Sequence, residues 1–233
     1  MIGVHMVQIA LDTRKLTRWA TDRRMDAGDL GYVCHALLCD AVGDLRPKPF
    51  AAEEKMGRVK VLGYAAADAA AMKACMAETA EPEVEACVLD IASKPMPSVW
   101  QAGRRYRFHL RVAPTRQGHH TDGVRFEKDA MAFVGAGADR YETYLQWLSE
   151  RIEGAAAIEA CQMTGFRIMK ACRRAVVGPG KRPAKAISLP DATFEGVLRI
   201  DDPAQFANVL RGGVGRHKAF GFGALMLRPP SAS

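Results

Sequence analysis

The sequence predicts an α+β protein of two halves, each an antiparallel sheet backed by helices. Along the first half the predicted order is strand, helix, strand, helix, strand, and a second such set follows a polar link at residues 118–123. The chain has 233 residues, enough for two small domains, and 48% apolar residues supply a sizeable core. We therefore expect an N-terminal domain over residues 1–117 and a C-terminal domain over residues 124–233.

The first half begins with alternating apolar and polar residues that predict a strand over residues 5–11. Asp29 is a typical helix N-cap, apolar residues then recur at three- and four-residue steps, and Gly43 ends the helix. Residues 12–26 are charged and ambiguous between helix and loop. The remaining predicted elements are strands at 59–64, 83–89 and 104–112, and an alanine-rich helix at 66–79.

The second half begins with apolar periodicity that predicts helices at 127–133 and 140–153. A long strand at 160–173, a Gly-Pro-Gly turn at 178–180 and an antiparallel return at 185–189 would form a basic hairpin. A strand at 194–200 follows, and Asp202-Pro203 opens a helix that runs to about Leu210. A glycine-rich loop then leads to a last strand at 222–227.

The glycine-rich loop carries five glycines within residues 212–223, with Arg-His-Lys at its centre. Glycine permits positive φ and close approach to a ligand, and successive free N–H groups in such a turn bind anions. Three basic side chains there favour a polyanion, although the loop could equally be a plain connection to the last strand. The candidate RNA contacts in this loop are Gly213, Gly215, Arg216, His217 and Gly221.

The charge distribution also favours an acidic partner. The formal net charge is +7, and residues 160–190 contain no Asp or Glu. A solvated face normally mixes signs, so a stretch of one sign indicates a phosphate footprint, with a solubilising surface strand as the alternative. The basic residues of this stretch are Arg167, Lys170, Arg173, Arg174, Lys181, Arg182 and Lys185.

The six cysteines show no C-x-x-C spacing and lie in apolar surroundings, so we expect reduced thiols and neither a metal site nor a cofactor. The first residues do not resemble a signal peptide, and no apolar run approaches the ~20 residues that span a bilayer. We expect a cytoplasmic protein without a membrane partner.

Tyr32 and His35 lie three residues apart on the predicted early helix and therefore share one helical face. Histidine is the usual proton donor or acceptor near neutral pH. The alternative interpretation is a histidine packed at the edge of the helix.

Several motifs together resemble a known family. The first is a strand, Phe194-Glu195-Gly196-Val197-Leu198-Arg199-Ile200, followed by a helix and by Gly213-Val214-Gly215-x-x-Lys218-Ala219-x-Gly221-x-Gly223. Others are Tyr32-x-x-His35 before an apolar helix, Lys94-Pro95-Met96-Pro97, and Arg107-Phe108-His109-Leu110-Arg111-Val112-x-Pro114. These motifs resemble the CRISPR-associated repeat endoribonucleases, and among them the CasE branch of type I-E systems. The resemblance covers most of the chain.

The resemblance implies two tandem ferredoxin-like (RRM-like) domains and RNA cleavage without a metal or other cofactor. In that family the RNA 2′-hydroxyl attacks the adjacent phosphate and leaves a cyclic phosphate and a 5′-hydroxyl. By matching position, His35 is the leading acid/base residue, Tyr32 orients the 2′-hydroxyl or shares proton transfer, and Lys218 stabilises the charged transition state. His217 is an extra residue here, either a second proton-transfer group or a phosphate contact.

The resemblance further implies that the substrate is the hairpin of a CRISPR repeat. The enzyme would keep the 3′ stem-loop of the crRNA and remain a subunit of a Cascade-like effector complex. The basic hairpin at residues 167–185 is the candidate for reading the stem.

Three alternatives stay open at this point. The first is a non-catalytic subunit that holds a guide RNA. The second is a type IV nuclease that uses arginines, for which Arg23 and Arg24 are placed just before the early helix. The third is an unrelated basic RNA-binding module, such as a ribosome-associated protein.

Overall fold

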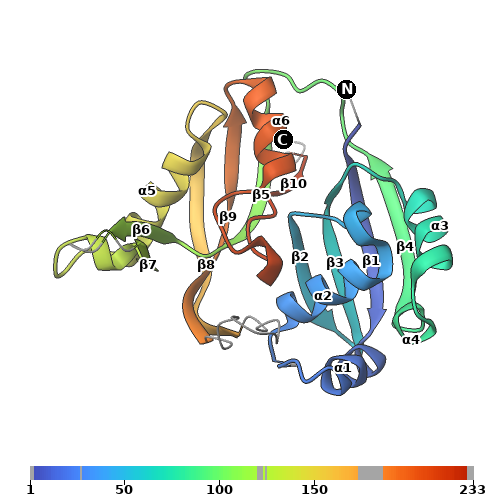
Figure 1. The fold of residues 1–233 in the computed structure, drawn as a ribbon. Coiled ribbons are helices and arrows are strands. Elements are labelled where there is room, and N and C mark those ends of the chain that lie inside the picture. The colour runs from blue at the N-terminus through green and yellow to red at the C-terminus, as the bar shows by residue number, and fades with distance from the viewer. Residues whose placement is uncertain (1–2, 27, 120–122, 124, 173–185, 230–233) are drawn as a thin grey trace. The chain divides into compact units, whose positions relative to one another are not determined.

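The structure, a computed structural model, describes residues 3–26, 28–119, 123, 125–172 and 186–229 (Figure 1). The chain divides into two compact units. Unit 1 comprises Met1–Ser98, Lys170–Ser188 and Ala219–Gly221, and unit 2 comprises Val99–Met169, Leu189–Lys218 and Phe222–Ser233. The first division therefore falls at residue 98, before the predicted link at 118–123. The reason is strand pairing, because the strand at 105–112 forms its ladders with later strands of unit 2.

Unit 1 contains a four-stranded antiparallel sheet with the strand order β2-β3-β1-β4. This order, with a helix after the first and after the third strand, is the ferredoxin-like topology. Alternate residues of β1 (Val7, Ile9 and Leu11) are buried, as its sequence pattern predicts. The elements are β1 (His5–Asp12), α1 (Thr13–Asp22), α2 (Leu30–Val42), η1 (Gly43–Leu45), β2 (Phe50–Lys55), β3 (Arg58–Ala65), α3 (Ala69–Thr79), α4 (Pro82–Glu85) and β4 (Val88–Pro95).

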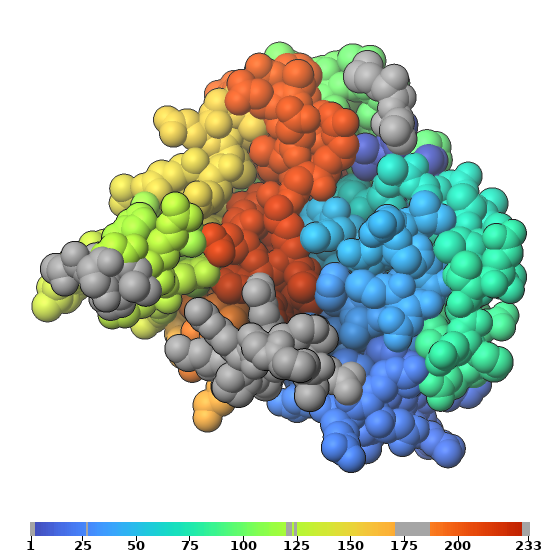
Figure 2. Space-filling model, viewed as in Figure 1, coloured from blue at the N-terminus to red at the C-terminus, as the bar shows by residue number. Residues whose placement is uncertain are grey.

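Helix α2 begins and ends where the sequence predicts. The Asp29 carboxylate accepts a hydrogen bond from the Tyr32 N–H at 3.0 Å, which satisfies a free donor of the first turn. Gly43 ends the helix with φ of 53°. Buried Val33, Leu37 and Leu38 fix one face of α2 in the core, while Tyr32 and His35 on another face are only half-buried. Figure 2 shows α2 and α3 side by side on one face of unit 1.

The predicted strand at residues 83–89 is wrong in its first half. Pro82 begins the short helix α4, with Glu83 and Glu85 in its first turn, and the strand starts only at Val88. Proline at the first position and acidic side chains beside it are both favourable for a helix start. Strand β2, which the sequence analysis did not predict, takes its conformation from pairing with β3.

Unit 2 repeats the same topology, with the strand order β10-β5-β9-β8. It adds a two-stranded antiparallel hairpin, β6–β7, between the first strand and the first helix of the pattern. The elements after residue 98 are β5 (Arg105–Val112), β6 (Thr115–His119), β7 (Arg125–Asp129), η2 (Ala130–Phe133), α5 (Arg140–Ile152), β8 (Ala156–Cys172), β9 (Ala186–Ile200), α6 (Pro203–Gly212), η3 (Lys218–Phe220) and β10 (Met226–Arg228). The end of β8, the start of β9 and the last two residues of η3 belong to unit 1.

The predicted helix at residues 127–133 is wrong for residues 127–129, and residues 130–133 form the short 3-10 helix η2. Residues up to Asp129 pair with β6, and the Asp129 carboxylate then caps the short η2 by accepting from the Met131 N–H at 2.9 Å. The predicted last strand at 222–227 begins only at Met226. Gly221 and Gly223 have positive φ (74° and 84°), which interrupts an extended strand before that point.

The two strands predicted at 185–189 and 194–200 form one strand, β9. The predicted turn at 178–180 lies outside the described residues, as does His120 beside the exposed His119 of β6. Both four-stranded sheets therefore have the ferredoxin-like strand order, which confirms the predicted fold class.

Three further observations concern the described residues as a whole. No helix among them is long and apolar enough to cross a membrane. The described part of the chain holds no cluster of three or more His, Cys, Asp or Glu side chains suited to a metal ion. The thiols of Cys34, Cys39, Cys75, Cys87 and Cys161 are free.

Candidate functional site

Tyr32 and His35 lie one turn apart on α2 and line the same pocket of unit 1, which has a volume of about 480 Å³. Both side chains are half-buried, so each is packed by its neighbours and still open to the pocket. Ala219, from the end of the glycine-rich loop, lines this pocket as well. The spacing of the two residues on one helical face, predicted from the sequence, is therefore confirmed.

The surroundings of His35 favour its neutral form. Burial, and then the positive charges of Arg46 and Lys48, hold the pKa of His35 below its usual value of 6.5. The Cys39 sulfur lies 3.8 Å from His35 Nε2, one turn further along α2. Burial raises the pKa of the Cys39 thiol, so this neighbour is uncharged near neutral pH. The imidazole is thus kept in the neutral form that a general base requires.

A glycine of α2 explains how residues 219–221 reach the pocket. A Cβ at Gly31 would overlap the backbone carbonyl of Phe220, so only glycine allows this close approach. The fully buried ring of Phe220 stacks on Tyr32, with ring centroids 5.6 Å apart and an interplanar angle of 28°. This stacking contact fixes the orientation of the tyrosine ring.

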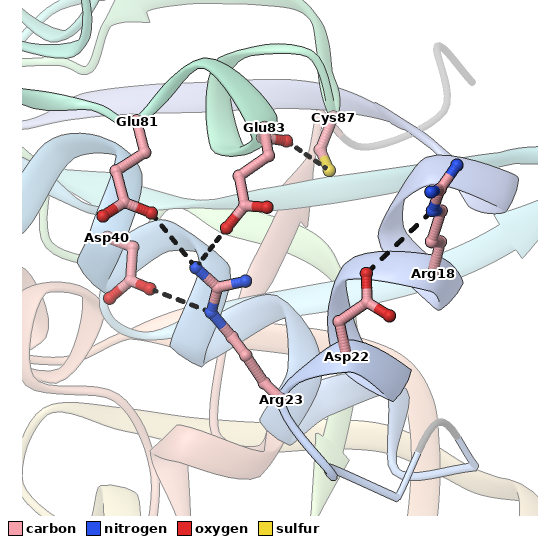
Figure 3. A network of polar contacts seen from close by, with 7 residues as sticks. All are labelled: Arg18, Asp22, Arg23, Asp40, Glu81, Glu83 and Cys87. Carbon is pink, nitrogen blue, oxygen red and sulfur yellow. Dashed lines mark hydrogen bonds and ion pairs between the residues drawn. The ribbon is translucent and has the colours of Figure 1, made fainter.

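Arg23, which also lines the pocket, is held by acidic residues from three sides (Figure 3). Its guanidinium contacts Glu83 at 2.6 Å, Glu81 at 3.3 Å and Asp40 at 3.9 Å. It also lies over the Trp19 ring at 4.6 Å. These contacts join α1 to α2 and α4, which indicates a structural role. Arg24 is exposed, with φ of 53°.

The glycine-rich loop of unit 2 has a defined backbone. Gly213 caps α6 with φ of 71°, and its N–H donates to the Val209 carbonyl at 2.7 Å. Gly215 has φ of 75° and lies against Trp147, where a Cβ would come within 2.8 Å of the ring. The glycines therefore serve the conformation and packing of the loop.

Arg216 and His217 of this loop both pair with Glu127 on β7. His217 Nε2 lies 2.8 Å from a Glu127 carboxylate oxygen, and the imidazole is only 6% exposed. Arg216 is half-exposed, and its Nε lies 3.4 Å from the other oxygen of the same carboxylate. Burial alone would raise the pKa of Glu127, but hydrogen bonds from Thr115 and His217 and the nearby positive charges hold it below its usual value.

Of the basic residues predicted to read an RNA stem, Arg167 and Lys170 lie on β8 with exposed side chains. Arg167 pairs at 2.7 Å with the buried Asp191, whose carboxylate Arg111 also binds at 2.8 Å. The other members of the set, Arg173, Arg174, Lys181, Arg182 and Lys185, lie outside the described residues.

The structure thus brings Tyr32 and His35 together in unit 1, and Arg216 and His217 together in unit 2. Lys218 is half-buried and begins η3, directly before Ala219 in the chain. Sequence reasoning missed Gly31 and Glu127. A glycine inside a helix costs about 1 kcal/mol relative to alanine, so Gly31 was a signal of close packing. Glu127 meets the loop only through the fold, and its sequence neighbours contain no signal of that contact.

Two units of ferredoxin-like topology, one with a tyrosine–histidine pocket, make this a tandem ferredoxin-like protein with a candidate acid–base site. The chain belongs to the CRISPR-associated protein family, whose characteristic sequence it matches over residues 4–229. Among curated proteins, none matches the sequence.

Solved structures share the fold over nearly the whole chain. CRISPR endoribonuclease Cse3 bound to a 19-nucleotide RNA is 20% identical, with 97% of this chain and 100% of that chain covered and a TM-score of 0.68. Cas6e from Escherichia coli K-12 is 19% identical, with 97% and 99% covered and a TM-score of 0.54. A chain of a CRISPR RNA-guided surveillance complex is 17% identical, with 96% and 98% covered and a TM-score of 0.54.

Proposed function

We propose that this protein is an endoribonuclease that binds the stem-loop of a CRISPR repeat and cuts precursor crRNA. The observation that carries the proposal is the pocket on α2, where a histidine with a lowered pKa and an oriented tyrosine face the same space as Ala219. Membership of the CRISPR-associated family and the fold shared with an RNA-bound endoribonuclease support it.

In the proposed reaction, neutral His35 accepts the proton of the 2′-hydroxyl. The 2′ oxygen then forms a bond to the adjacent phosphorus, and the bond from phosphorus to the 5′ oxygen breaks. The leaving 5′ oxygen takes up a proton from water and His35 returns its proton to the solvent, which leaves a 2′,3′-cyclic phosphate and a 5′-hydroxyl. Because the pKa of His35 lies below 6.5, its base form predominates at neutral pH.

Tyr32 and Lys218 have supporting roles in this proposal. The Tyr32 hydroxyl orients the 2′-hydroxyl, since its ring is fixed by Phe220. Lys218 directly precedes Ala219, which lines the pocket, and its ammonium group stabilises the charge that grows on the phosphate. No step of this chemistry calls for a metal ion.

The proposed partners follow from the same relatives. The RNA would be held by the basic residues at 167–185, of which Arg167 and Lys170 lie on β8, and by the glycine-rich loop, with steep salt dependence. After cleavage the protein would stay on the 3′ stem-loop as a subunit of a Cascade-like complex, as the fold shared with a chain of a surveillance complex suggests. We place this activity in the cytoplasm, with which the free thiols are compatible.

The test is single-turnover cleavage of the cognate repeat RNA by the wild type and by His35→Ala. We expect the variant to lose about 10²- to 10⁴-fold in rate and to bind the RNA as before, because a general base contributes on that order. RNA with a single 2′-deoxyribose at the cleavage site should bind and remain uncut. His109→Ala, a half-buried histidine on β5, is the matched control and should cleave normally.

Other outcomes would favour the alternatives. Tight binding without cleavage by the wild type would favour a guide-RNA scaffold. Full activity of His35→Ala with loss of activity in Arg24→Ala, a substitution of an exposed side chain, would favour chemistry based on arginine. Equal binding of unrelated hairpins would favour a general RNA-binding module.

A further inference from the structure

The backbone at His217, directly before the proposed catalytic lysine, is in an unusual conformation. His217 has φ of 61°, a left-handed value that residues with a side chain rarely adopt. Such a conformation persists only where the surroundings hold it, and conformations of this kind concentrate at functional sites. The contacts that hold His217 are therefore candidates for a functional role.

These contacts converge on one carboxylate. Glu127 lies 2.8 Å from His217 Nε2 through one oxygen and 3.4 Å from Arg216 Nε through the other. The Thr115 hydroxyl donates to the same oxygen that His217 contacts, so strand β6 fixes the carboxylate in turn. The imidazole is 6% exposed and the Glu127 side chain 21% exposed, so solvent screens the pair only weakly.

The surrounding fold holds this arrangement rigid. Thr115 and Glu127 lie on the two paired strands of the β6–β7 hairpin, which unit 2 adds to the ferredoxin-like pattern. The Trp147 indole of α5 donates to the Thr115 carbonyl at 3.0 Å and lies against Gly215. A strand hairpin and a helix thus hold the loop on both sides of Arg216.

We propose that Glu127 is a positioning residue for Lys218: it binds His217, holds the left-handed backbone there, and so sets the direction in which Lys218 leaves the loop. This inference rests on the proposed function, because it needs Lys218 to act on the scissile phosphate. The added hairpin is then the support of the catalytic loop, and His217 is its anchor and does not contact the RNA.

The test measures the single-turnover rate and the half-saturating protein concentration with the repeat RNA, for Glu127→Ala, His217→Ala, Lys218→Ala and Glu127→Ala/Lys218→Ala. We expect Glu127→Ala and His217→Ala each to lower the maximal rate about 10- to 100-fold, as misplacement of a catalytic group does. The half-saturating concentration should change less than about twofold. In the Lys218→Ala background, Glu127→Ala should lower the maximal rate by less than about threefold, because a positioning residue acts only through its target.

Two further variants separate positioning from a loss of folding. Glu127→Gln keeps the shape and one acceptor for His217, so it should recover part of the rate lost in Glu127→Ala. Glu159→Ala removes a carboxylate of similar exposure that pairs with Arg105 and Arg199 of the same sheet, and it should cleave normally.

Amide hydrogen exchange of residues 216–220 in the free protein supplies a readout that does not depend on cleavage. Faster exchange in Glu127→Ala than in Glu159→Ala is expected. If the wild type cuts no RNA, the proposed function fails and exchange still tests the anchor. The inference would be overturned by normal amide exchange in Glu127→Ala or by a parental cleavage rate in that variant. It would also be overturned if Glu127→Ala lowered the cleavage rate equally in the presence and in the absence of Lys218.

Discussion

The two halves of the chain share a topology and differ in charge. Residues 1–98 hold 14 acidic and 12 basic side chains, whereas residues 99–233 hold 12 acidic and 21 basic ones. Both four-stranded sheets nevertheless have the same strand order. The shared fold therefore does not determine the function of either half, which depends on the side chains placed on it.

The second and third strands of the two units differ in length. The second and third strands of unit 1, β2 and β3, have 6 and 8 residues, while their counterparts in unit 2, β8 and β9, have 17 and 15. In unit 1 an arginine such as Arg23 meets three carboxylates, whereas Arg167 on the long β8 keeps a 70% exposed side chain although it pairs with Asp191. Residues 160–190, which hold basic and no acidic side chains and include most of β8, are suited to bind a polyanion, and unit 1 is suited to hold the acid–base group.

Gly31→Ala tests the assignment of the chemistry to unit 1, and we expect it to have the largest effect on the cleavage rate among the variants that compare the two halves. Alanine favours the helix by about 1 kcal/mol over glycine, so α2 itself should form at least as well. Its Cβ would overlap the Phe220 carbonyl, and residues 219–221 must then move away from Tyr32. We expect at least an approximately 10-fold loss in the single-turnover rate with unchanged circular dichroism, because catalysis is sensitive to such displacements.

Gly135→Ala is the matched control for that substitution, since a Cβ there meets nothing within 4 Å. It should cleave at the parental rate. An active Gly31→Ala protein would mean that the contact between α2 and Phe220 has no part in cleavage, and the assignment of the chemistry to unit 1 would lose its main structural support.

A smaller effect, on binding alone, is expected from Arg167→Ala/Lys170→Ala. Asp191 keeps its ion pair with Arg111, so the sheet should stay folded. Removal of two phosphate contacts should lower the slope of log K against log salt by about 2 and weaken binding about 10-fold at moderate ionic strength. Fluorescence anisotropy with the repeat hairpin at several salt concentrations measures both quantities.

The corresponding change in the N-terminal half, Arg14→Ala/Lys15→Ala, removes two exposed basic residues from α1 and should leave the slope unchanged. Equal effects of the two double variants would show that RNA binding is not confined to the basic half. The division of roles between the halves would then be wrong.

The sequence predicted most of what depends on local patterns. Helix α2 could be predicted from its Asp29 cap, its periodic apolar residues and Gly43, and the pair of Tyr32 and His35 on one face followed from it. The ferredoxin-like fold of both units was implied by the family resemblance, whereas the order of elements predicted for the first half lacked β2. Patterns of period 2 and 3.6 are local, so a single sequence contains them.

The rest depends on contacts between distant residues. Strand β7 resembles a helix in isolation and becomes a strand because β6 pairs with it, which also brings Glu127 to His217, 90 positions away in the chain. The lowered pKa of His35 depends on burial and on charges from beyond the end of its own helix. Neither effect has a local sequence signal, since both arise from the packing of separate elements.

The smallest predicted effect concerns the charge of the pocket itself. Burial and the charges of Arg46 and Lys48 lower the pKa of His35, so Arg46→Gln should raise that pKa toward 6.5, and Lys48→Gln should raise it less. The His35 ring-proton shift in NMR, followed against pH, measures both changes, with the exposed Lys60→Gln as a control that should not alter it.

The sign of the accompanying change in activity identifies the role of His35. A base must be neutral, so the rate falls as pH drops through the pKa of His35, and a raised pKa moves this acidic limb to higher pH. If His35 acted as the acid, the alkaline limb would move instead.

The free energy of unfolding also depends on the pKa of His35. In the wild type, unfolding becomes easier as pH falls from 6.5 to the lower folded pKa, because the unfolded chain then binds the extra proton, and Arg46→Gln should narrow that window.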